Sequence, residues 1–332
     1  METSGMGELS LVKHIRESFF KPVDGLVAGI GDDAAVLKPP DGCLVVTTDA
    51  LMEGVHFDLT YCSLYQVGYK LVSVNVSDIY AMGARPLYML LSLSIPPQSA
   101  VSTNIEEFLS GMRSALDIYN AALVGGDVTS SRSGLALSAT IIGVSEKTPV
   151  MRNGAKPGDR VYVTGSLGDS AAGLHALRKL GKVVRIENSE TIDDFPLSWN
   201  ILKPLINRHL MPAVKQLPST EHISSMMDIS DGLAMDLRRL CGESGVGSRI
   251  YEKNLPISVE MTALCRYLDL NPLDLCLCGG EDYELLFTSS SCDSVTDAVY
   301  IGEIVQGDSV IIVTQNSSET ELKDCGYDHF KN

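Results

Sequence analysis

The sequence predicts a two-domain chain of mixed α/β (α+β) class, and three observations support this prediction. The chain has 332 residues, enough for one large or two medium domains with a buried core. Short apolar runs typical of strands alternate with segments of helical periodicity in both halves. A polar Pro/Gly segment at 155–159 interrupts this alternation. We therefore expect one domain over residues 1–150 and another over 151–332.

The periodicity of apolar residues predicts the individual elements. In the first half it predicts helices over 8–20, 64–82 and 105–120, and strands over 44–47, 87–95 and 135–144. In the second half it predicts helices over 170–180 and 232–240, and strands over 161–164, 299–305 and 310–313. Residues 226–231 are expected to form a strand followed by a turn, and 276–286 a strand interrupted by Gly279 and Gly280. Residues 181–200 are polar and irregular, so we expect a surface excursion there.

Charge and hydropathy exclude some classes of function. The formal net charge is −16, which makes nucleic acid and anionic membranes poor partners because both are polyanions. The longest apolar run, 87–95, is too short to span a bilayer. The N-terminus lacks the basic and apolar regions of a signal peptide. We expect a cytoplasmic protein.

The chain contains 8 cysteines and no C-x-x-C pair, so zinc-finger spacing is absent. The nearest pair, Cys276 and Cys278, would point to one face of the strand that we expect there. We interpret the cysteines as free, mostly buried thiols in a reducing compartment.

The usual phosphate-binding glycine motifs are incomplete. Lys182 follows Gly181, but Val183 stands where a Walker A motif needs Ser or Thr. Gly29 and Gly31 lack the third glycine of a dinucleotide fingerprint. If the protein binds nucleotide phosphates, metal ions held by carboxylates are the alternative device.

Aspartates beside glycine or small polar residues offer this alternative in five places. They are Asp32 and Asp33, Asp49, Asp78, Asp127, and Asp228 with Asp231. Mg²⁺ prefers oxygen ligands, usually one or two carboxylates with water and phosphates. A structural role is the competing interpretation, because Asp is also common at helix N-caps and in Asp-Gly turns. Asp78 fits that role poorly, since it lies in an apolar helix pattern on the same face as Asn75.

Nine motifs in order identify the chain, over about 29–330, as similar to thiamine-monophosphate kinases of the aminoimidazole ribonucleotide synthetase-like superfamily. The motifs are GIGDDAAVL, TTDALMEGVHF, NVSDIYAMGARP, GGDVT, GAKPGDRVYVTG, GDSAAGL, DISDGL, GGEDYELLF and GYDHF. The resemblance implies a dimer whose N-domain sheets pair, and a C-domain α/β sandwich. Residues 1–150 would bind ATP and Mg²⁺ and dimerise, and 151–332 would complete the active site. The implied reaction is direct in-line transfer of a phosphoryl group from ATP to thiamine monophosphate, the final step of thiamine diphosphate biosynthesis.

The same resemblance implies roles for individual residues. Several Mg²⁺ ions would be bound by Asp33, Thr47, Thr48, Asp49, Asp78, Asp127, Asp228 and Asp231, among which Asp49, Asp127 and Asp231 would be catalytic. ATP would contact Gly126, Asp127, Arg152, Ser230 and Tyr119. His56 and Glu281 would contact the thiamine substrate. Asp324 and Cys325 stand where relatives can carry an aromatic residue that covers the substrate, and Tyr327 or Phe330 would substitute for it.

Structural alternatives apply to four of these residues. His56, between Val55 and Phe57, fits a core histidine, and Tyr119 fits a helix core. Glu281 fits a turn residue and Arg152 a solvated loop charge. Two other functions also remain open. One is a superfamily relative such as selenophosphate synthetase, which would need a reactive Cys in a glycine-rich N-terminal segment, or an amidine-forming purine synthetase. The other is a non-catalytic nucleotide- or metal-binding module.

Overall fold

The structure is a computed structural model that describes residues 7–100, 102–186, 195–291 and 297–330. The chain divides into two compact units. Unit 1 comprises Met1–Tyr80, Ala84–Pro149 and Gly181–Arg185, and unit 2 comprises Ala81–Gly83, Val150–Leu180 and Ile186–Asn332. Among the described residues, no helix is long and apolar enough to cross a membrane.

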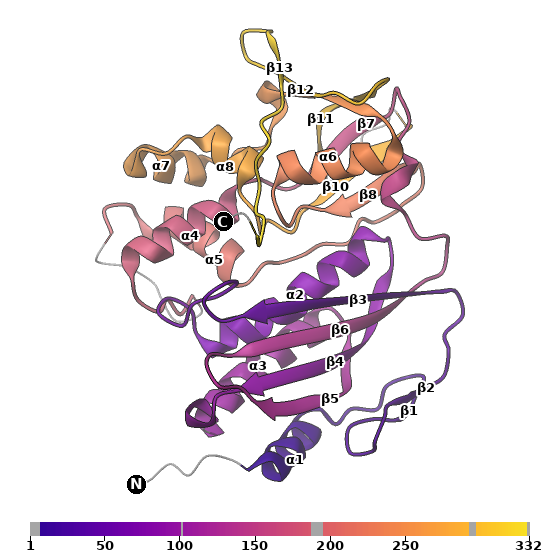
Figure 1. Cartoon of the computed structure of the whole chain (residues 1–332), viewed down its shortest axis with the longest axis vertical. Helices are drawn as coiled ribbons and strands as arrows, with labels where there is room; N and C mark the ends of the chain where they lie inside the picture. The colour runs from indigo at the N-terminus through magenta and orange to yellow at the C-terminus, as the bar shows by residue number, and fades with distance from the viewer. Residues whose placement is uncertain (1–6, 101, 187–194, 292–296, 331–332) are drawn as a thin grey trace. The chain divides into compact units, whose positions relative to one another are not determined.

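Unit 1 is built on a four-stranded sheet of order β3-β6-β4-β5, with α2 and α3 on one face (Figure 1). β4 pairs parallel with β5 and antiparallel with β6. A short antiparallel pair, β1 with β2, stands apart from this sheet. The elements are α1 Glu8–Phe19, β1 Leu26–Ala28, β2 Val36–Leu37, β3 Cys43–Met52, α2 Leu64–Ala81, β4 Arg85–Ile95, η1 Pro97–Ser99, α3 Ser102–Ile118, β5 Ala122–Ser130 and β6 Ala136–Ser145.

Helices α2 and α3 cross closely because each has a glycine at the crossing. A Cβ atom on Gly68 would lie 2.2 Å from the carbonyl oxygen of Phe108, and one on Gly111 would lie 1.8 Å from that of Tyr65. Such distances are too short for any side chain. Most of α2 is therefore buried, and its polar residues must find partners inside unit 1.

Unit 2 contains a seven-stranded mixed sheet of order β13-β12-β9-β11-β7-β10-β8, in which only β12 and β9 pair in parallel. Helix α4 packs on α5, where a Cβ on Gly173 would lie 2.1 Å from the carbonyl oxygen of Leu205. The elements are η2 Arg152–Gly154, β7 Arg160–Thr164, α4 Asp169–Leu180, α5 Trp199–Leu210, β8 Ile223–Asp228, α6 Leu233–Ser244, β9 Gly247–Tyr251, η3 Glu252–Asn254, α7 Val259–Leu268, α8 Pro272–Cys278, β10 Leu285–Ser289, β11 Ala298–Val305, β12 Val310–Val313 and β13 Glu319–Glu321.

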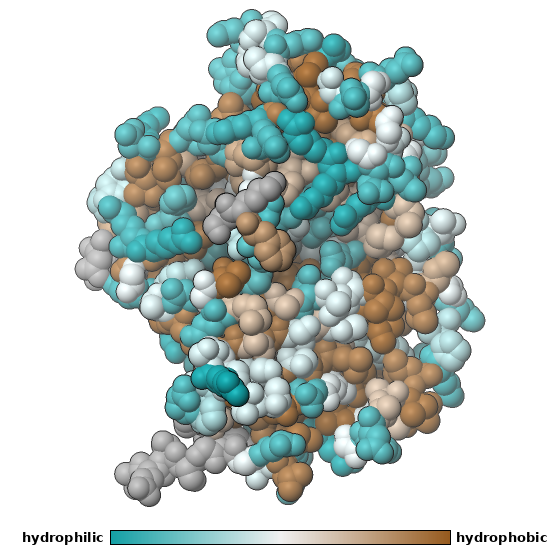
Figure 2. Space-filling view, in the orientation of Figure 1, coloured by the Kyte–Doolittle hydropathy of each residue, from teal (hydrophilic) through white to brown (hydrophobic). Residues whose placement is uncertain are grey.

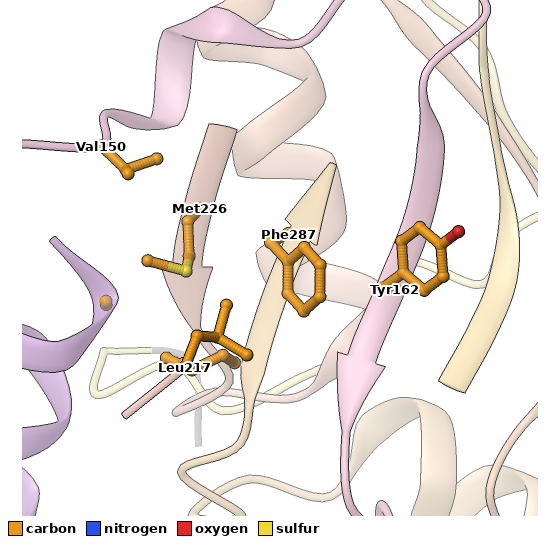
Figure 3. Packing of buried hydrophobic residues seen from close by; sticks show 7 residues of the cluster. Val150, Tyr162, Leu217, Met226 and Phe287 are labelled. Atoms are coloured by element: carbon orange, nitrogen blue, oxygen red, sulfur yellow. The ribbon is translucent and has the colours of Figure 1, made fainter. Parts of the chain in front are cut away.

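One face of the unit 2 sheet carries a compact hydrophobic cluster (Figure 3). The rings of Tyr162 on β7 and Phe287 on β10 stack with centroids 5.4 Å apart. Met226 on β8 belongs to the same cluster, as do Val150 and Leu217 from the connecting segments. Phe287 is fully buried, so this cluster stabilises the strand that follows the GGEDY loop.

Three of the expected elements are wrong. The expected strand over 276–286 is helix α8 followed by a loop, and strand β10 begins only at Leu285. The expected strand over 44–47 is too short, because β3 runs from Cys43 to Met52 in register with β6 and so includes Asp49. Within the expected excursion 181–200, Val184 is 3% exposed and its carbonyl accepts a hydrogen bond from Gln66. Residues 187–194 lie outside the described residues, and α5 begins at Trp199.

The interpretation of all cysteines as free thiols is also wrong. Cys278 and Cys325 form a disulfide with their Cα atoms 5.3 Å apart, although 47 residues separate them in sequence. Of the five free cysteines that the structure describes, Cys43 is exposed and the other four are buried, namely Cys62, Cys241, Cys265 and Cys276. The eighth cysteine, Cys292, lies outside the described residues. Folding brings Cys278 and Cys325 together, and their sequence spacing does not predict the pair.

Candidate active site

Helix α2 and strand β3 bring four of the polar residues of unit 1 together. The Thr47 hydroxyl donates to the Asp78 carboxylate at 2.5 Å. One turn earlier on α2, the Asn75 side chain accepts a hydrogen bond from the Asp49 backbone N–H at 3.0 Å and donates to the Leu71 carbonyl at 2.9 Å. Asn75 is fully buried. The shared helical face expected for Asn75 and Asp78 is therefore the face that contacts β3.

Thr48 points away from this group. Successive side chains of a strand alternate between faces, so Thr47 and Asp49 share one face and Thr48 lies on the other. Its hydroxyl donates to the Ala139 carbonyl at 3.0 Å and accepts from Thr140 at 3.1 Å. The Thr48 side chain therefore does not join Thr47, Asp49 and Asp78, and only its main chain lies between theirs.

Gly126 and Asp127 lie on β5, beside a cavity of about 120 Å³ between β5 and α1. Val12, Ile15 and Leu91 contribute apolar side chains to its lining. Gly126 has φ 151°, and a Cβ there would lie 1.9 Å from the Leu91 carbonyl oxygen. Close strand packing therefore explains this glycine without any ligand. Asp127 and Glu8 are the two ionisable residues that line the cavity.

The remaining unit 1 candidates lie at separate places. His56 is half-buried in the turn after β3, where its Nδ1 accepts from the Met52 backbone N–H at 3.0 Å. Tyr119 is 6% exposed, its ring contacts Tyr80 edge-on, and its hydroxyl lies 3.1 Å from that of Ser73. Asp33 is exposed, and its backbone N–H donates to the Asp32 side chain.

In unit 2, the loop 230–232 is held by a residue that the sequence interpretation missed. One carboxylate oxygen of Asp236 accepts the backbone N–H groups of Ser230, Asp231 and Gly232 at 3.1, 3.1 and 3.2 Å. Arg239 donates to Asp236 at 2.9 Å and to Asp231 at 2.6 Å, so it bridges the two carboxylates.

Asp236 is fully buried. Burial and the neighbouring Asp231 charge raise its pKa to about 6, although Arg239 and the backbone hydrogen bonds act in the opposite direction. A signal for this residue exists in the sequence. Asp236 falls on the apolar stripe of α6 with Leu233, Leu237 and Leu240, where a carboxylate needs a partner.

The loop 279–284 packs against loop 230–232. The Glu281 backbone N–H donates to the Ser230 carbonyl at 2.7 Å, with Glu281 at φ 65°. Its carboxylate lies 3.3 Å from Nδ1 of His209, a buried residue of α5 that is also 3.2 Å from the Ser170 hydroxyl. The turn interpretation of Glu281 and its candidate role are thus compatible, because its backbone shapes the loop while its side chain faces His209.

Asp282 fastens the same loop to the start of α4. It is fully buried and accepts the backbone N–H groups of Gly168 and Ser170 at 2.6 and 3.1 Å. Burial raises its pKa to about 7, against the lowering effect of these two hydrogen bonds and of Arg208. Two residues on, Glu284 pairs with Arg208 at 2.5 Å. Neither carboxylate was a candidate from the sequence.

The last unit 2 candidates differ in their surroundings. Asp228 is 4% exposed at the end of β8, directly before the loop 230–232. The Arg152 side chain is exposed, and its carbonyl accepts from the Ser244 hydroxyl at 2.8 Å. Asp324 is exposed in the segment 322–330, which reaches the loop where the Tyr327 backbone N–H donates to the Asp231 carbonyl at 3.0 Å.

The structure therefore gathers the candidates into two groups, one in each unit. Thr47, Asp49 and Asp78 lie together in unit 1, with Asp127 on another strand. Loops 230–232 and 279–284 converge in unit 2. Within the described ranges, no three or more His, Cys, Asp or Glu side chains form a group that could hold a metal ion.

Comparisons with known proteins match this arrangement over nearly the whole chain. Family models for AIR synthase related proteins match residues 31–145 with their N-terminal domain and 156–315 with their C-terminal domain. The thiamine-monophosphate kinase of Aquifex aeolicus is 36% identical over 336 residues, covering 99% of this chain and 100% of that protein.

Two solved structures are similar at the level of the fold and the sequence. AaThiL complexed with AMPPCP and TMP superposes with a TM-score of 0.75 at 33% identity, over 98% of this chain and 97% of the other. The thiamine-monophosphate kinase of Stenotrophomonas maltophilia K279a gives 0.79 at 32% identity, over 93% and 97%. The two-domain α/β fold expected from the sequence is confirmed by these matches.

Proposed function

This chain belongs to the thiamine-monophosphate kinase family of AIR synthase related proteins, and on that premise we propose that it transfers the γ-phosphoryl group of ATP to thiamine monophosphate. The observation that carries the proposal is the similarity, over 98% of this chain, to a relative complexed with AMPPCP and TMP. The product would be thiamine diphosphate, and the reaction would be the last step of its biosynthesis. A cytoplasmic location remains our expectation.

The metal part of the proposal depends on the chemistry of the candidate ligands. These are Asp carboxylates and Thr oxygens only, the donors that Mg²⁺ prefers. Within this set, Thr47, Asp78 and Asp49 are held close together by hydrogen bonds between β3 and α2. Because Mg²⁺ usually takes one or two carboxylates plus water and phosphate, a cluster of three carboxylates is not required. We infer that Asp33, Thr47, Thr48, Asp49, Asp78, Asp127, Asp228 and Asp231 would supply the ligands, Thr48 through its main chain.

The acceptor supplies its own nucleophile. A phosphate monoester has a second pKa of about 6, so the acceptor phosphate is largely dianionic at pH 7 and needs no general base. The barrier comes from bringing two anions together, since like charges ~4 Å apart repel by about 4 kcal/mol at an effective dielectric of 20. Bound Mg²⁺ would neutralise charge on both phosphates. The exposed Arg152 guanidinium would add a bidentate phosphate contact.

The other residues would bind and orient the two substrates. Gly126, Asp127 and Ser230 would contact ATP, and the loop containing Ser230 is preorganised by Asp236. His56, Glu281 and Asp324 would contact the thiamine portion. Tyr119 would contact ATP from its buried position in unit 1.

We also propose a homodimer. Leu44 and Val46 on β3 are 55% and 61% exposed. Because they alternate along the strand with Thr47 and Asp49, which face α2, their side chains lie on the opposite face of the sheet. Figure 2 shows hydrophobic residues gathered over the sheet of unit 1. A second copy of this sheet would cover them. Light scattering at micromolar concentration should give the mass of a dimer, and a monomer mass would contradict the proposal.

The deciding experiment is a coupled ADP-release assay with thiamine monophosphate and with free thiamine, each with and without excess EDTA. We expect EDTA-sensitive turnover with the monophosphate only. Comparable kcat/KM for thiamine would show that the acceptor is an alcohol and that the proposed chemistry is wrong. If no ADP is released with either acceptor, the other superfamily activities or a non-catalytic binding module would be favoured.

A further inference from the structure

Three segments of unit 2 meet beside the proposed acceptor site. The loop 230–232 carries Asp231, and the loop 279–284 carries Glu281. The C-terminal segment, residues 322–330, contacts the first loop through the backbone bond from Tyr327 to Asp231. The packing is close, because a Cβ on Gly326 would lie 2.9 Å from the Asp231 carbonyl oxygen. These contacts place the C-terminal segment against Asp231, and the Glu281 backbone contacts the neighbouring Ser230 of the same loop.

The disulfide joins two of these segments at the points where they enter the site. Cys278 ends helix α8, directly before Gly279 and the loop of Glu281. Cys325 directly precedes Gly326 and Tyr327. Both cysteines are half-buried, so a thiolate from outside can reach the bond. Cys276, two positions before Cys278 on α8, is fully buried and remains a free thiol.

The other contacts that the structure describes for the C-terminal segment are non-covalent. Its beginning is anchored by the Leu322 backbone N–H, which donates to the Val310 carbonyl at 2.8 Å, and by the Arg238 guanidinium, which donates to the Leu322 carbonyl. An exposed ion pair of Lys323 with Asp274 adds a further contact. Exposed ion pairs of this kind contribute little. Beyond Cys325, the Tyr327 backbone bond ties the segment to the loop, and Phe330 is 98% exposed. Apart from the chain itself, the disulfide is therefore the covalent bond among the described residues that fixes residues 325–330 next to the end of α8.

The two loops do not depend on the disulfide in this way. Asp236 holds loop 230–232 through three backbone hydrogen bonds, and Asp282 holds loop 279–284 against α4. The Glu281 backbone is bonded directly to Ser230. Breaking the disulfide would remove the covalent link between the C-terminal segment and helix α8, and it would leave these hydrogen bonds of the loops in place.

We propose that the disulfide between Cys278 and Cys325 is a redox site that a dithiol reductant reduces. In the oxidised form, the disulfide positions the C-terminal segment over the phosphorylated acceptor. One reductant thiolate attacks a sulfur of the pair, and the second displaces the mixed disulfide. Two electrons and two protons pass to the cysteines, giving two thiols, and the reductant becomes a disulfide.

The proposal rests on the proposed function, and it predicts which kinetic constant changes. Residues 325–330 contact Asp231 and are joined to Cys278, three positions before Glu281, so their displacement should weaken acceptor binding. If the reduced segment occupies its place for roughly 10–20% of the time, the apparent KM for thiamine monophosphate rises about five- to tenfold. The KM for ATP stays unchanged, because loop 230–232 is held by Asp236.

The test compares full-length protein before and after treatment with a dithiol reductant. Alkylation and mass spectrometry should show two more free thiols after treatment than before it, at Cys278 and Cys325, since these two cysteines form the disulfide. Reduction should raise the KM for thiamine monophosphate and not that for ATP. Cys278→Ser/Cys325→Ser should show the raised KM without reductant and no response to it. Cys43→Ser, which removes an exposed cysteine of unit 1, should respond as the wild type does.

Amide hydrogen exchange of the C-terminal segment supplies a readout independent of turnover. Its protection should fall on reduction in the wild type, and it should be low in the double variant at all times. Free thiols at Cys278 and Cys325 in the untreated protein, or equal KM values and equal protection in both forms, would overturn the proposal. If neither form turns over thiamine monophosphate, the proposed function fails, and the exchange data alone then decide whether the disulfide positions the segment.

Discussion

Asn75 provides the sharpest test of how unit 1 positions a candidate catalytic residue. It is fully buried and makes two hydrogen bonds, one from the Asp49 backbone N–H and one to the Leu71 carbonyl. Asn75→Ala removes both. At about 1 kcal/mol per bond, the free energy of unfolding should fall by about 2 kcal/mol, and slightly more if the small cavity stays empty.

The functional effect should exceed this loss of stability. The Asp49 backbone would lose this hydrogen bond to α2, and a displacement of about 1 Å at a reacting centre can lower turnover about 100-fold. Asn75→Ala should therefore remain folded at 25 °C and yet lose most of its kcat. The bond from Thr47 to Asp78 is separate and should persist.

Ser73→Ala is the matched control, because it removes a buried side chain from the same helix. Ser73 is fully buried and its hydroxyl lies 3.1 Å from that of Tyr119, away from β3. This variant should lose about 1 kcal/mol and keep a near-normal kcat at saturating substrates, because a role of Tyr119 in ATP binding would change the KM for ATP. Urea unfolding gives the stability of each variant, and ADP release at saturating substrates gives kcat. Equal kcat for both variants would show that the Asn75 contact with β3 only stabilises the fold.

Three other variants test named residues and contacts. Asp49→Asn should abolish turnover while leaving urea unfolding unchanged, and near-normal activity would give Asp49 a structural role. Phe287→Ala should cost about 3–5 kcal/mol in urea unfolding, since the ring is fully buried and stacked on Tyr162, and a loss below about 1 kcal/mol would argue against that packing. The pKa of Asp282 is raised to about 7 by burial, so between roughly pH 4 and 7 the unfolded chain loses this proton and the folded chain keeps it. Stability should therefore fall as pH rises, by up to about 4 kcal/mol from this group, and Asp282→Asn should flatten that slope in unfolding measured from about pH 4 to 8.

The main elements of unit 1 could be predicted from the sequence, because their apolar residues repeat at helical or strand spacing over long stretches. Helix α2 and strands β4 and β6 are of this kind. Helix α8 could not be predicted as easily, since a run of seven residues rich in Leu and Cys is too short for its period to be read. Its start does carry a local signal, namely the N-cap Asn271 followed by Pro272.

For the site, the sequence by itself determined which residue types are present and which of them share an element. The pairing of Asn75 and Asp78 on one helical face is an example, because helical periodicity is a local property. Only the tertiary structure decided what those residues touch. Asp236 beneath loop 230–232, His209 beside Glu281, and the joining of Cys278 to Cys325 all depend on how separate segments of unit 2 pack. Their partners are selected by packing of the whole unit, which leaves no periodic trace in the sequence.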